Sequence, residues 1–427
     1  MNSLYKDRIH RASILNDFFV QLAICTFFGV LLPPLLYFNK NAFTAIPANP
    51  VYNSIVGSFI ATSIAIFLAR KVTTYPGVKQ LGPVFPSFLL SFGGLAIFVL
   101  SARISYSVPI FALNFVVSIA TYLALSVSTS RKHITYFAVK GGRIDRMELG
   151  DVDYIILDQP SLPETDHSMI VADLHYDHSD EWERTLAHAA LRGIPVFHFK
   201  QILETTTGQV QIEHLSENSF GSLLPNLPYV RAKRSLDFIG AVVLLPILAV
   251  PMLVISILIK LETPGPAFFR QHRVGYRGEI FSVMKFRTMR VARAEDDEEK
   301  RREEAKTQDS DPRITPLGAF LRKTRLDEVP QIINILKGEM SWIGPRPEAL
   351  ELSRWYEREL PFYSYRHVVR PGITGWAQVN QGHVTELADI DHKLRYDFYY
   401  IKHFSYWLDV LITVRTLKVM TSGFGAK

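Results

Sequence analysis

The sequence predicts a membrane α-helical bundle of four spans, a small α/β module, and a mostly α-helical third part attached to the membrane by a re-entrant helix. Apolar residues make up 48% of the chain and the mean hydropathy is positive, although 21% of the residues are charged. Four apolar segments precede residue 130, and a fifth that is interrupted by prolines lies at 236–260. Such a mixture is typical of apolar membrane segments joined to soluble parts.

The composition also limits the classes of partner and site. The formal net charge of +6 is modest for 427 residues, and acidic and basic residues are interleaved. We therefore expect membrane lipid, and no nucleic acid, beside the basic residues. Cys25 is the single cysteine, which excludes a disulfide framework or a cysteine-rich metal site within one chain.

Residues 1–130 are predicted to form the four-helix transmembrane unit. The apolar segments 14–38, 53–70, 83–102 and 106–128 each approach the roughly 20 residues that a spanning helix needs. Basic residues gather at the N-terminus, between the second and third segments and after the fourth, so both ends of the unit are expected in the cytoplasm. The alternative is that 53–70 is a buried helix of a soluble domain.

Residues 133–225 have an alternating, more polar pattern, which predicts a small Rossmann-like α/β accessory module. Residues 152–157 and 169–172 are predicted strands, 180–192 a helix and 193–198 the next strand, an order that favours a parallel sheet. No glycine-rich phosphate loop accompanies them, so a dinucleotide site is not expected.

The expected role of this module is scaffolding or dimerisation, with a homodimer forming through the module and the membrane unit. Asp151-Val152-Asp153 matches the Asp-x-Asp of metal-dependent glycosyltransferases. Three residues are a weak signal, however, and polar residues that enter a strand explain the match equally well.

Residues 236–260 are predicted to form a re-entrant membrane helix. The segment is apolar apart from Asp237 and is interrupted by Pro246 and Pro251, each of which removes a backbone donor and clashes with the preceding turn. Basic residues stand on both sides of the segment, which disfavours a simple crossing. A helix that bends at the prolines returns both ends to the cytoplasmic face. The alternative is a straight fifth span.

The chain after residue 262 is predicted to be soluble or interfacial. The stretches 268–275 and 281–289 place cations among apolar residues, a pattern that suits anionic ligands at a headgroup layer and also cations that snorkel beside lipid. The charged run 295–304 has oppositely charged pairs at helical spacing, which favours a solvated helix or loop over an acidic metal cluster.

Two short helices are predicted around a pair of adjacent carboxylates. Thr315-Pro316 is a good helix start, and the apolar spacing after residue 328 predicts a second helix that Gly338 closes. Asp327 and Glu328 then fall at the N-terminus of the second helix, where the macrodipole lowers a carboxylate pKa and helps to hold a phosphate. On this pattern alone, a plain helix cap stays an open alternative.

A rigid arginine follows the carboxylate pair. Gly344-Pro345-Arg346-Pro347 fixes Arg346 between two prolines, and a fixed guanidinium suits bidentate phosphate binding. The combination of a carboxylate pair with this cation favours a phosphate site.

The region 231–427 resembles the bacterial sugar transferase family, the monotopic polyprenyl-phosphate phosphoglycosyl transferases that initiate exopolysaccharide, capsule or O-antigen (lipopolysaccharide) synthesis. Besides the proline-broken helix, seven motifs match in order: Lys233-Arg234-x-x-Asp237, Lys285 to Met289, Asp311 to Thr315, Leu326 to Gln331, Leu336 to Ser341, Gly344 to Glu348 and Arg370 to Trp376. The four-span unit and the α/β module resemble the accessory parts of the long members.

The resemblance implies an enzyme, an undecaprenyl-phosphate hexose-1-phosphate transferase, on the cytoplasmic face of the bacterial inner membrane. It implies transfer of a sugar 1-phosphate from a UDP-sugar to undecaprenyl phosphate, with release of UMP and a requirement for Mg²⁺. It further implies that Asp327 is the nucleophile of a covalent aspartyl intermediate and a metal ligand, and that Glu328 is its partner. UDP-glucose or UDP-galactose is the expected donor, and N-acetylated sugars stay open as alternatives.

The resemblance also implies phosphate binding by Arg346. Four further cations are candidates for substrate binding: Lys285, Arg287, Arg313 and Arg370. The chain departs from the family where members commonly break the re-entrant helix at a Ser-Pro pair, because Ala249-Val250-Pro251 stands there instead. Two other hypotheses stay open, a non-catalytic membrane regulator that binds nucleotide sugars or lipid, and a transferase without a covalent step.

Overall fold

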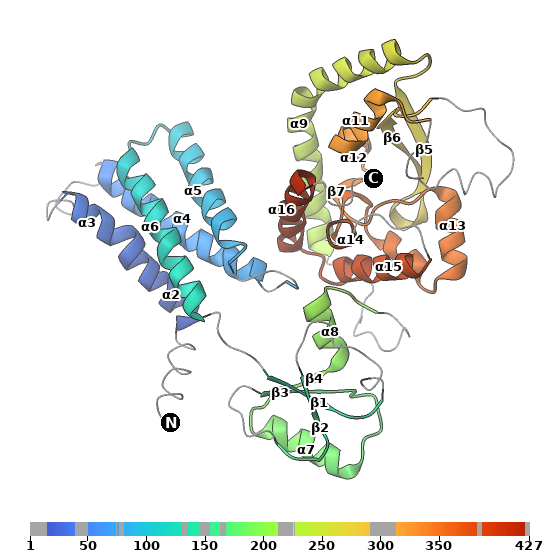
Figure 1. The fold of residues 1–427 in the computed structure, drawn as a ribbon. Helices are drawn as coiled ribbons and strands as arrows, with labels where there is room; N and C mark the ends of the chain where they lie inside the picture. The colour runs from blue at the N-terminus through green and yellow to red at the C-terminus, as the bar shows by residue number, and fades with distance from the viewer. Residues whose placement is uncertain are drawn as a thin grey trace. The chain divides into compact units, whose positions relative to one another are not determined.

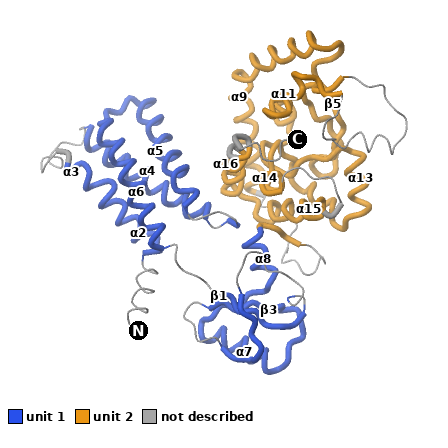
Figure 2. The backbone as a smooth tube through the Cα atoms, viewed as in Figure 1, with its two compact units in different colours: residues 1–207 blue, residues 208–427 orange. Residues whose placement is uncertain are grey.

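The protein is described by a computed structural model that covers residues 15–38, 50–73, 75–76, 81–129, 135–142, 144, 154–162, 168–211, 225, 227–290, 313–381 and 387–422. Two compact units, residues 1–207 and 208–427, divide the chain (Figure 2). Asp151, Asp153 and the charged run 295–304 lie outside the described residues.

The first part of unit 1 contains apolar helices (Figure 1). Their bounds are α2 (Phe18–Cys25), the π-helical turn η1 (Thr26–Leu31) and α3 (Leu32–Phe38), which follow one another directly, then α4 (Pro50–Thr73), α5 (Val84–Ser101) and α6 (Val108–Thr129). These bounds agree to within a few residues with the four predicted apolar segments. Each of the four stretches is long and apolar enough to cross a membrane.

The second part of unit 1 is a four-stranded parallel sheet with the strand order β2-β1-β3-β4. Its elements are β1 (Thr135–Val139), β2 (Tyr154–Leu157), β3 (Ser168–Ala172), α7 (Asp180–Leu191), β4 (Val196–His198) and α8 (Phe199–Thr207). The parallel sheet, its last three strands and α7 confirm the prediction. The first strand, β1, is not among the predicted strands, because a five-residue apolar run just after the fourth span has no separate periodic signal.

Alternation along β1 builds a core on both faces of this sheet. Phe137 packs in the cluster that includes Ala189 of α7, whereas its neighbour Ala138 packs in the cluster that includes Phe199, the first residue of α8. Successive strand residues point to opposite faces, so the two helices cover opposite sides of the sheet.

Unit 2 begins with α9 (Leu227–Glu262), which contains Pro246 and Pro251. Figure 1 shows that α9 is bent. A straight helix of 36 residues would be about 54 Å long. The kink has the expected cause, since each proline breaks the hydrogen-bond ladder of the helix.

Both ends of α9 contact the same domain. Near its start, the Arg234 guanidinium donates to the carbonyl oxygens of Ile335 and Leu336 at 2.6 and 2.9 Å. Just after its end, the Arg287 guanidinium donates to the carbonyl oxygens of Thr263 and Pro264 at 2.7 and 2.9 Å. The domain therefore holds both arms of the bent helix.

The rest of unit 2 is mostly helical, with two small two-stranded sheets. The elements are β5 (Phe268–Val274), η4 (Tyr276–Gly278), β6 (Ile280–Phe286), α11 (Pro316–Thr324), η5 (Leu326–Gln331), α12 (Ile332–Lys337), β7 (Ser341–Ile343), α13 (Leu350–Glu359), η6 (Tyr363–Val368), β8 (Gly372–Thr374), α14 (Trp376–Asn380), α15 (Leu387–Lys402) and α16 (Tyr406–Ser422). Strands β5 and β6 form an antiparallel hairpin, and β7 and β8 pair in parallel.

One core cluster joins α9, the hairpin and the two short helices. Its buried members include Ala241 of α9, Phe286 of β6, Leu321 of α11 and Ile335 of α12. Burial of this apolar surface fixes the position of η5, which lies between α11 and α12 in the chain.

Candidate active site

The carboxylate pair lies in a tight turn between two short helices. Thr315 caps α11 by accepting a hydrogen bond from the Gly318 N–H at 3.0 Å, as predicted. Arg325 ends α11 in a left-handed conformation, and the 3₁₀ turn η5 begins at the next residue. Asp327 and Glu328 therefore stand in the first turn of η5 and not at the start of a longer α-helix.

The predicted second helix is thus correct in place but shorter than expected. Helix α12 begins only at Ile332, and Gly338 closes it with a φ of +85°, as predicted. Pro330 has no N–H to donate within the preceding turn, which accounts for the tighter winding before Ile332. A six-residue helix has a small macrodipole, so burial and neighbouring charges decide the state of the two carboxylates.

Glu328 is held by two cations. Its Oε1 accepts hydrogen bonds from Lys285 Nζ at 3.0 Å and from the Arg346 guanidinium at 2.6 Å. Burial acts to raise the pKa of Glu328, but the charges and hydrogen bonds of Arg346 and Lys285 outweigh it and hold that pKa well below its usual range. Glu328 is therefore a stable anion that positions both cations.

Asp327 has a different environment, although it is the next residue. Its side chain is buried, and Oδ1 has no hydrogen-bond partner within the described part of the chain. Burial raises the pKa of the Asp327 carboxyl and the Glu328 charge raises it further, against the opposing charges of Lys285, Arg346 and Arg322. The prediction of a lowered pKa at this position is wrong, because desolvation exceeds the effect of the helix end.

The two cations also differ in their response to pH. Burial lowers the pKa of Lys285 to about 8, although the Glu328 charge opposes this shift. The Glu328 charge raises the pKa of Arg346, so this guanidinium keeps its charge throughout the working range. Lys285 is therefore the cation of the site that can lose its proton near neutral pH.

Two further arginines, the buried Arg366 and the partly buried Arg273, hold the loop that carries Arg346. The Arg366 guanidinium donates to the Arg346 carbonyl oxygen at 2.8 Å and to Asp397 Oδ2 at 2.9 Å. The Arg273 guanidinium donates to the Pro347 carbonyl oxygen. These contacts fix the backbone on both sides of the Arg346–Pro347 peptide bond.

Close backbone contacts explain two glycines of the family motifs. A Cβ on Gly344 would lie 2.3 Å from the Arg370 carbonyl oxygen, and a Cβ on Gly372 would lie 2.1 Å from the Gly344 nitrogen. Both positions require glycine, because the loops after β7 and before β8 cross in contact. The Gly-Pro-Arg-Pro and Arg-Pro-Gly motifs thus form one support for Arg346.

The structure brings together four of the predicted site residues, Asp327, Glu328, Arg346 and Lys285, but places the others differently. Arg287 is buried and directed at the carbonyl oxygens that follow α9. The carbonyl oxygen of Arg313 accepts a hydrogen bond from the Arg290 N–H at 2.9 Å. Arg370 donates to the Gly338 carbonyl oxygen at 3.0 Å and lies over the Tyr276 ring.

Three residues beside the site have no predicted role. Arg322 lowers the pKa of Asp327 through its charge and donates to Thr288 Oγ1 at 3.0 Å. Arg273 and Arg366 support the Arg346 loop. The sequence feature that could have indicated a role for all three is an arginine among apolar residues. That pattern does not distinguish a buried structural arginine from one that binds substrate.

A cavity of about 620 Å³ lies elsewhere in unit 2. Its lining includes Tyr276, Arg277, Arg354 and Tyr365, and it includes neither Asp327 nor Glu328.

Within the described residues, the site offers a carboxylate oxygen without a hydrogen-bond partner, beside two positive charges. Such an oxygen can attack an electrophile whose developing negative charge the cations stabilise. It can also bind a hard cation, since Mg²⁺ is commonly held by one or two carboxylates together with substrate phosphates. Asp327 therefore fits the predicted Mg²⁺ when a phosphate ligand completes the coordination.

Comparison with known proteins places this site in a family. Residues 229–423 match the family model described as bacterial sugar transferase. The UDP-N-acetylgalactosamine-undecaprenyl-phosphate N-acetylgalactosaminephosphotransferase of Aeromonas hydrophila is 40% identical over 378 residues, which cover 88% of each chain.

Two other relatives match a shorter part of the chain. The UDP-glucose:undecaprenyl-phosphate glucose-1-phosphate transferase of Xanthomonas campestris pv. campestris is 46% identical over 190 residues, or 44% of this chain and 38% of the relative. The protein of the same name from Escherichia coli (strain K12) is 39% identical over 187 residues, or 43% of this chain and 39% of the relative. On the match that extends over both units, the chain belongs to the bacterial sugar transferase family.

Proposed function

We propose that the chain transfers a sugar 1-phosphate from a UDP-sugar to undecaprenyl phosphate, releases UMP and so initiates exopolysaccharide, capsule or O-antigen synthesis. The observation that carries the proposal is the buried Asp327 carboxylate. Its Oδ1 has no partner among the residues that the structure describes, while Lys285 and Arg346 neutralise Glu328 beside it. The names of the relatives, which pair a sugar with undecaprenyl phosphate, support the two substrates.

The reaction proceeds through two displacements at one phosphorus atom. Asp327 attacks the phosphate that carries the sugar, and the bond from this phosphorus to the bridging oxygen breaks, so that UMP leaves with that oxygen. A phosphate oxygen of undecaprenyl phosphate then attacks the same phosphorus, and the bond to Asp327 breaks. The raised pKa of Asp327 supports its role, because a more basic carboxylate is a better nucleophile once it is ionised.

The neighbouring residues orient and neutralise the substrate phosphates. Arg346 and Lys285 stabilise the charge that develops on the phosphate oxygens, while Glu328 keeps both cations in place. Asp327 is the residue we propose to hold Mg²⁺, which, when bound, would neutralise the diphosphate. Arg287, Arg313 and Arg370 enter the proposal only as second-tier substrate contacts, with Arg287 and Arg370 also engaged in backbone contacts.

The donor is a UDP-hexose or its N-acetylated form. Glucose and galactose are the predicted sugars, and two relatives that match less than half of the chain are named for glucose. The relative that aligns with both units is named for N-acetylgalactosamine. UDP-N-acetylgalactosamine therefore joins them in a panel of UDP-sugars, and the donor that gives the fastest UMP release identifies the substrate.

The reaction is proposed at the cytoplasmic face of the bacterial inner membrane. Residues 1–130 would span the membrane four times, 133–225 would be an accessory module, and 231–427 would be the catalytic domain with α9 re-entrant. The bend in α9 and the contacts of both its arms with one domain support this topology. A homodimer through the membrane unit and the module stays a prediction.

The proposal is tested by replacing the nucleophile. Asp327→Asn keeps the size of the side chain but removes its charge, so UMP release from the UDP-sugar should fall by at least about three orders of magnitude. The matched control, Asp389→Asn, changes an exposed aspartate of the same unit and should retain wild-type activity. Wild-type activity in Asp327→Asn at equal expression would contradict the assignment.

The covalent step needs its own measurement. Enzyme mixed with UDP-sugar alone, without lipid phosphate, should release one UMP per site and carry the phosphosugar on Asp327 in a peptide mass spectrum. No adduct during turnover would favour direct transfer. Wild type that binds UDP-sugar or lipid without releasing UMP, with the same binding in Asp327→Asn, would instead favour the non-catalytic regulator.

A further inference from the structure

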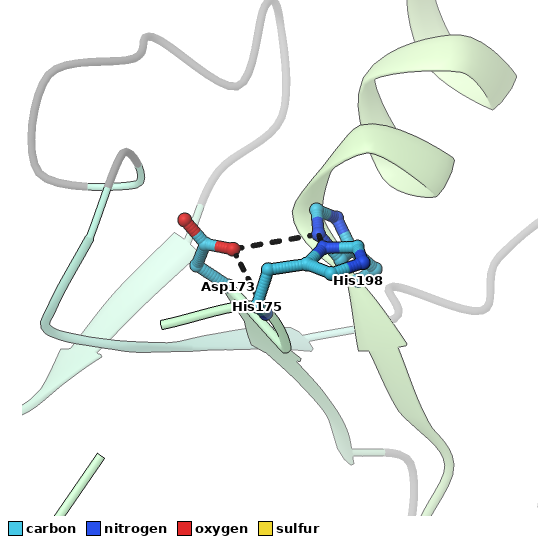
Figure 3. Close-up of side chains that lie close together, drawn as sticks. All are labelled: Asp173, His175 and His198. Carbon is cyan, nitrogen blue, oxygen red and sulfur yellow. Dashed lines mark hydrogen bonds and ion pairs between the residues drawn. The ribbon is translucent and has the colours of Figure 1, made fainter. Parts of the chain in front are cut away.

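The α/β module contains a cluster of metal-ligating side chains that lies in unit 1 and plays no part in the proposed reaction. Asp173, His175 and His198 each offer a ligand atom, and these atoms all lie within 4.8 Å of one another. Figure 3 shows the Asp173 carboxylate and the two imidazole rings pointing toward one another.

The parallel sheet explains why these residues meet. Ala172 and His198 are register partners in the neighbouring strands β3 and β4, so Asp173 follows β3 at the edge where His198 ends β4. His175 comes two residues later in the loop after β3. The carboxyl edge of a parallel sheet is the place where α/β domains commonly bind ligands.

The distances fit a small bound cation after little adjustment. His198 Nε2 lies 3.4 Å from Asp173 Oδ1 and 2.8 Å from His175 Nδ1. Ligand bonds of about 2.0–2.1 Å at tetrahedral angles separate ligand atoms by about 3.3 Å. The two ring nitrogens must move apart by about half an ångström, and the ligand atoms of Asp173 and His175, which lie within 4.8 Å of each other, must reach the same separation. The side chain of His175 is exposed and has room for this adjustment.

The surrounding contacts hold the other two ligands. Asp173 is 6% exposed, and its Oδ2 lies where a Cβ on Gly142 would meet it at 2.5 Å, so the loop after β1 closes on the carboxylate. His198 is 9% exposed and caps the start of α8, where its Nδ1 accepts a hydrogen bond from the Lys200 N–H at 3.1 Å. The loop after β1 and the start of α8 therefore place Asp173 and His198 at the edge of the sheet before a metal binds.

That hydrogen bond also determines which ring nitrogen of His198 carries the proton before a metal binds. Because Nδ1 accepts a hydrogen bond, the neutral His198 ring carries its proton on Nε2, between Asp173 and His175. A cation bound at Nε2 takes the place of this proton. The ring then carries its proton on Nδ1, so Nδ1 can no longer accept from the Lys200 N–H and metal binding costs the cap at the start of α8.

We propose that Asp173, His175 and His198 bind a Zn²⁺ ion at the edge of the α/β module. Two imidazole nitrogens and one carboxylate oxygen form a ligand set that Zn²⁺ commonly has, and they leave a fourth position for water or an anionic ligand. Mg²⁺ prefers oxygen ligands in octahedral geometry and does not compete for this site. Without a metal, the same residues form a hydrogen-bonded cluster.

The test measures zinc binding to the full-length protein in detergent after treatment with a chelator. The Asp327→Asn background removes the site of the proposed reaction from the measurement. Isothermal titration should give one Zn²⁺ per chain, and excess Mg²⁺ should leave the affinity unchanged. His175→Ala should weaken the affinity at least about tenfold, and the exposed His188→Ala in α7 is the matched control, which should not change it.

A second variant separates ligation from structure. His175→Cys offers another zinc ligand and should retain binding that His175→Ala loses, while both variants melt at the wild-type temperature without zinc. The proposal is wrong if the protein with all three ligands intact binds no Zn²⁺, or if the same protein with His175→Ala binds Zn²⁺ as tightly. Neither result depends on transferase activity, so the site and the proposed function fail separately.

Discussion

At the scale of residues, Asp327 and Glu328 differ because their neighbours differ. Glu328 has two hydrogen-bonded cations, which hold its pKa well below the usual range against the effect of burial. Asp327 is buried next to that anion and its Oδ1 has no partner among the described residues, so its pKa is raised. Glu328 thus stays ionised and positions the two cations, whereas Asp327 stays available to react.

The pH dependence of UMP release follows from this division. Ionisation of Asp327 gives an acid limb above the usual pH range of a carboxyl, because its pKa is raised. Lys285, whose pKa is about 8, loses its charge as the pH rises through that value, which gives a basic limb. Lys285→Arg should keep the acid limb and lose the basic limb, since a guanidinium stays charged to above pH 12.

The pH–rate profiles of wild type and Lys285→Arg provide the measurement. The acid limb is an internal control, because it depends on Asp327 and is present in both proteins. A basic limb near pH 8 that persists unchanged in Lys285→Arg would show that another group causes it.

At the scale of elements, a buried contact ties α16 to the first arm of α9. Lys233 Nζ donates to Asp409 Oδ2 at 2.6 Å, and the hydroxyls of Tyr229 and Tyr400 donate to the same carboxylate at 2.6 and 2.9 Å. Lys233 and Asp409 are both 7% exposed. Asp409 is the nearer of two carboxylates beside Lys233, since Asp237 Oδ1 lies 3.8 Å from the same Nζ. Loss of the nearer partner leaves a buried lysine poorly neutralised, so this contact fixes α9 on the domain more than it adds net stability.

Asp409→Asn should therefore destabilise unit 2. Loss of one partner from a buried pair costs about 3–5 kcal/mol, which corresponds to a melting temperature lower by about 10 °C. Asp391→Asn, which removes a partly exposed i,i+4 partner of Arg395, is the matched control and should cost about 0.5 kcal/mol or less. Thermal unfolding in detergent measures both, and equal melting temperatures would contradict the role of Asp409.

Elements were more predictable from sequence than their contacts. Thr315-Pro316 and Gly338 are local signals, and the structure confirms both helix ends. The 3₁₀ turn that holds Asp327 was not predicted, because its winding depends on where α11 ends. Nor could a pattern assign Arg287 to the carbonyl oxygens after α9, since that contact joins residues 24 positions apart.

At the scale of the whole molecule, the active site has to be accessible to both proposed substrates. Undecaprenyl phosphate lies in the bilayer, whereas a UDP-sugar is a charged, water-soluble molecule. A re-entrant α9 would serve both, because its apolar arms enter the lipid while the domain that they hold stays at the aqueous face. A straight α9 would instead carry the domain to the opposite side from its nucleotide substrate.

The proposed topology predicts which positions a membrane-impermeant thiol reagent reaches. In a Cys25→Ser background, which removes the only native cysteine, Arg103→Cys tests the connection between α5 and α6, and a cysteine added after Lys427 tests the catalytic domain. Arg103→Cys should react in intact spheroplasts, whereas the C-terminal cysteine should react only after lysis. A C-terminal cysteine that reacts in intact spheroplasts would mean that the chain crosses the membrane an odd number of times. The re-entrant helix would then be wrong, because a direct measurement of accessibility takes precedence over a topology inferred from flanking charges and two prolines.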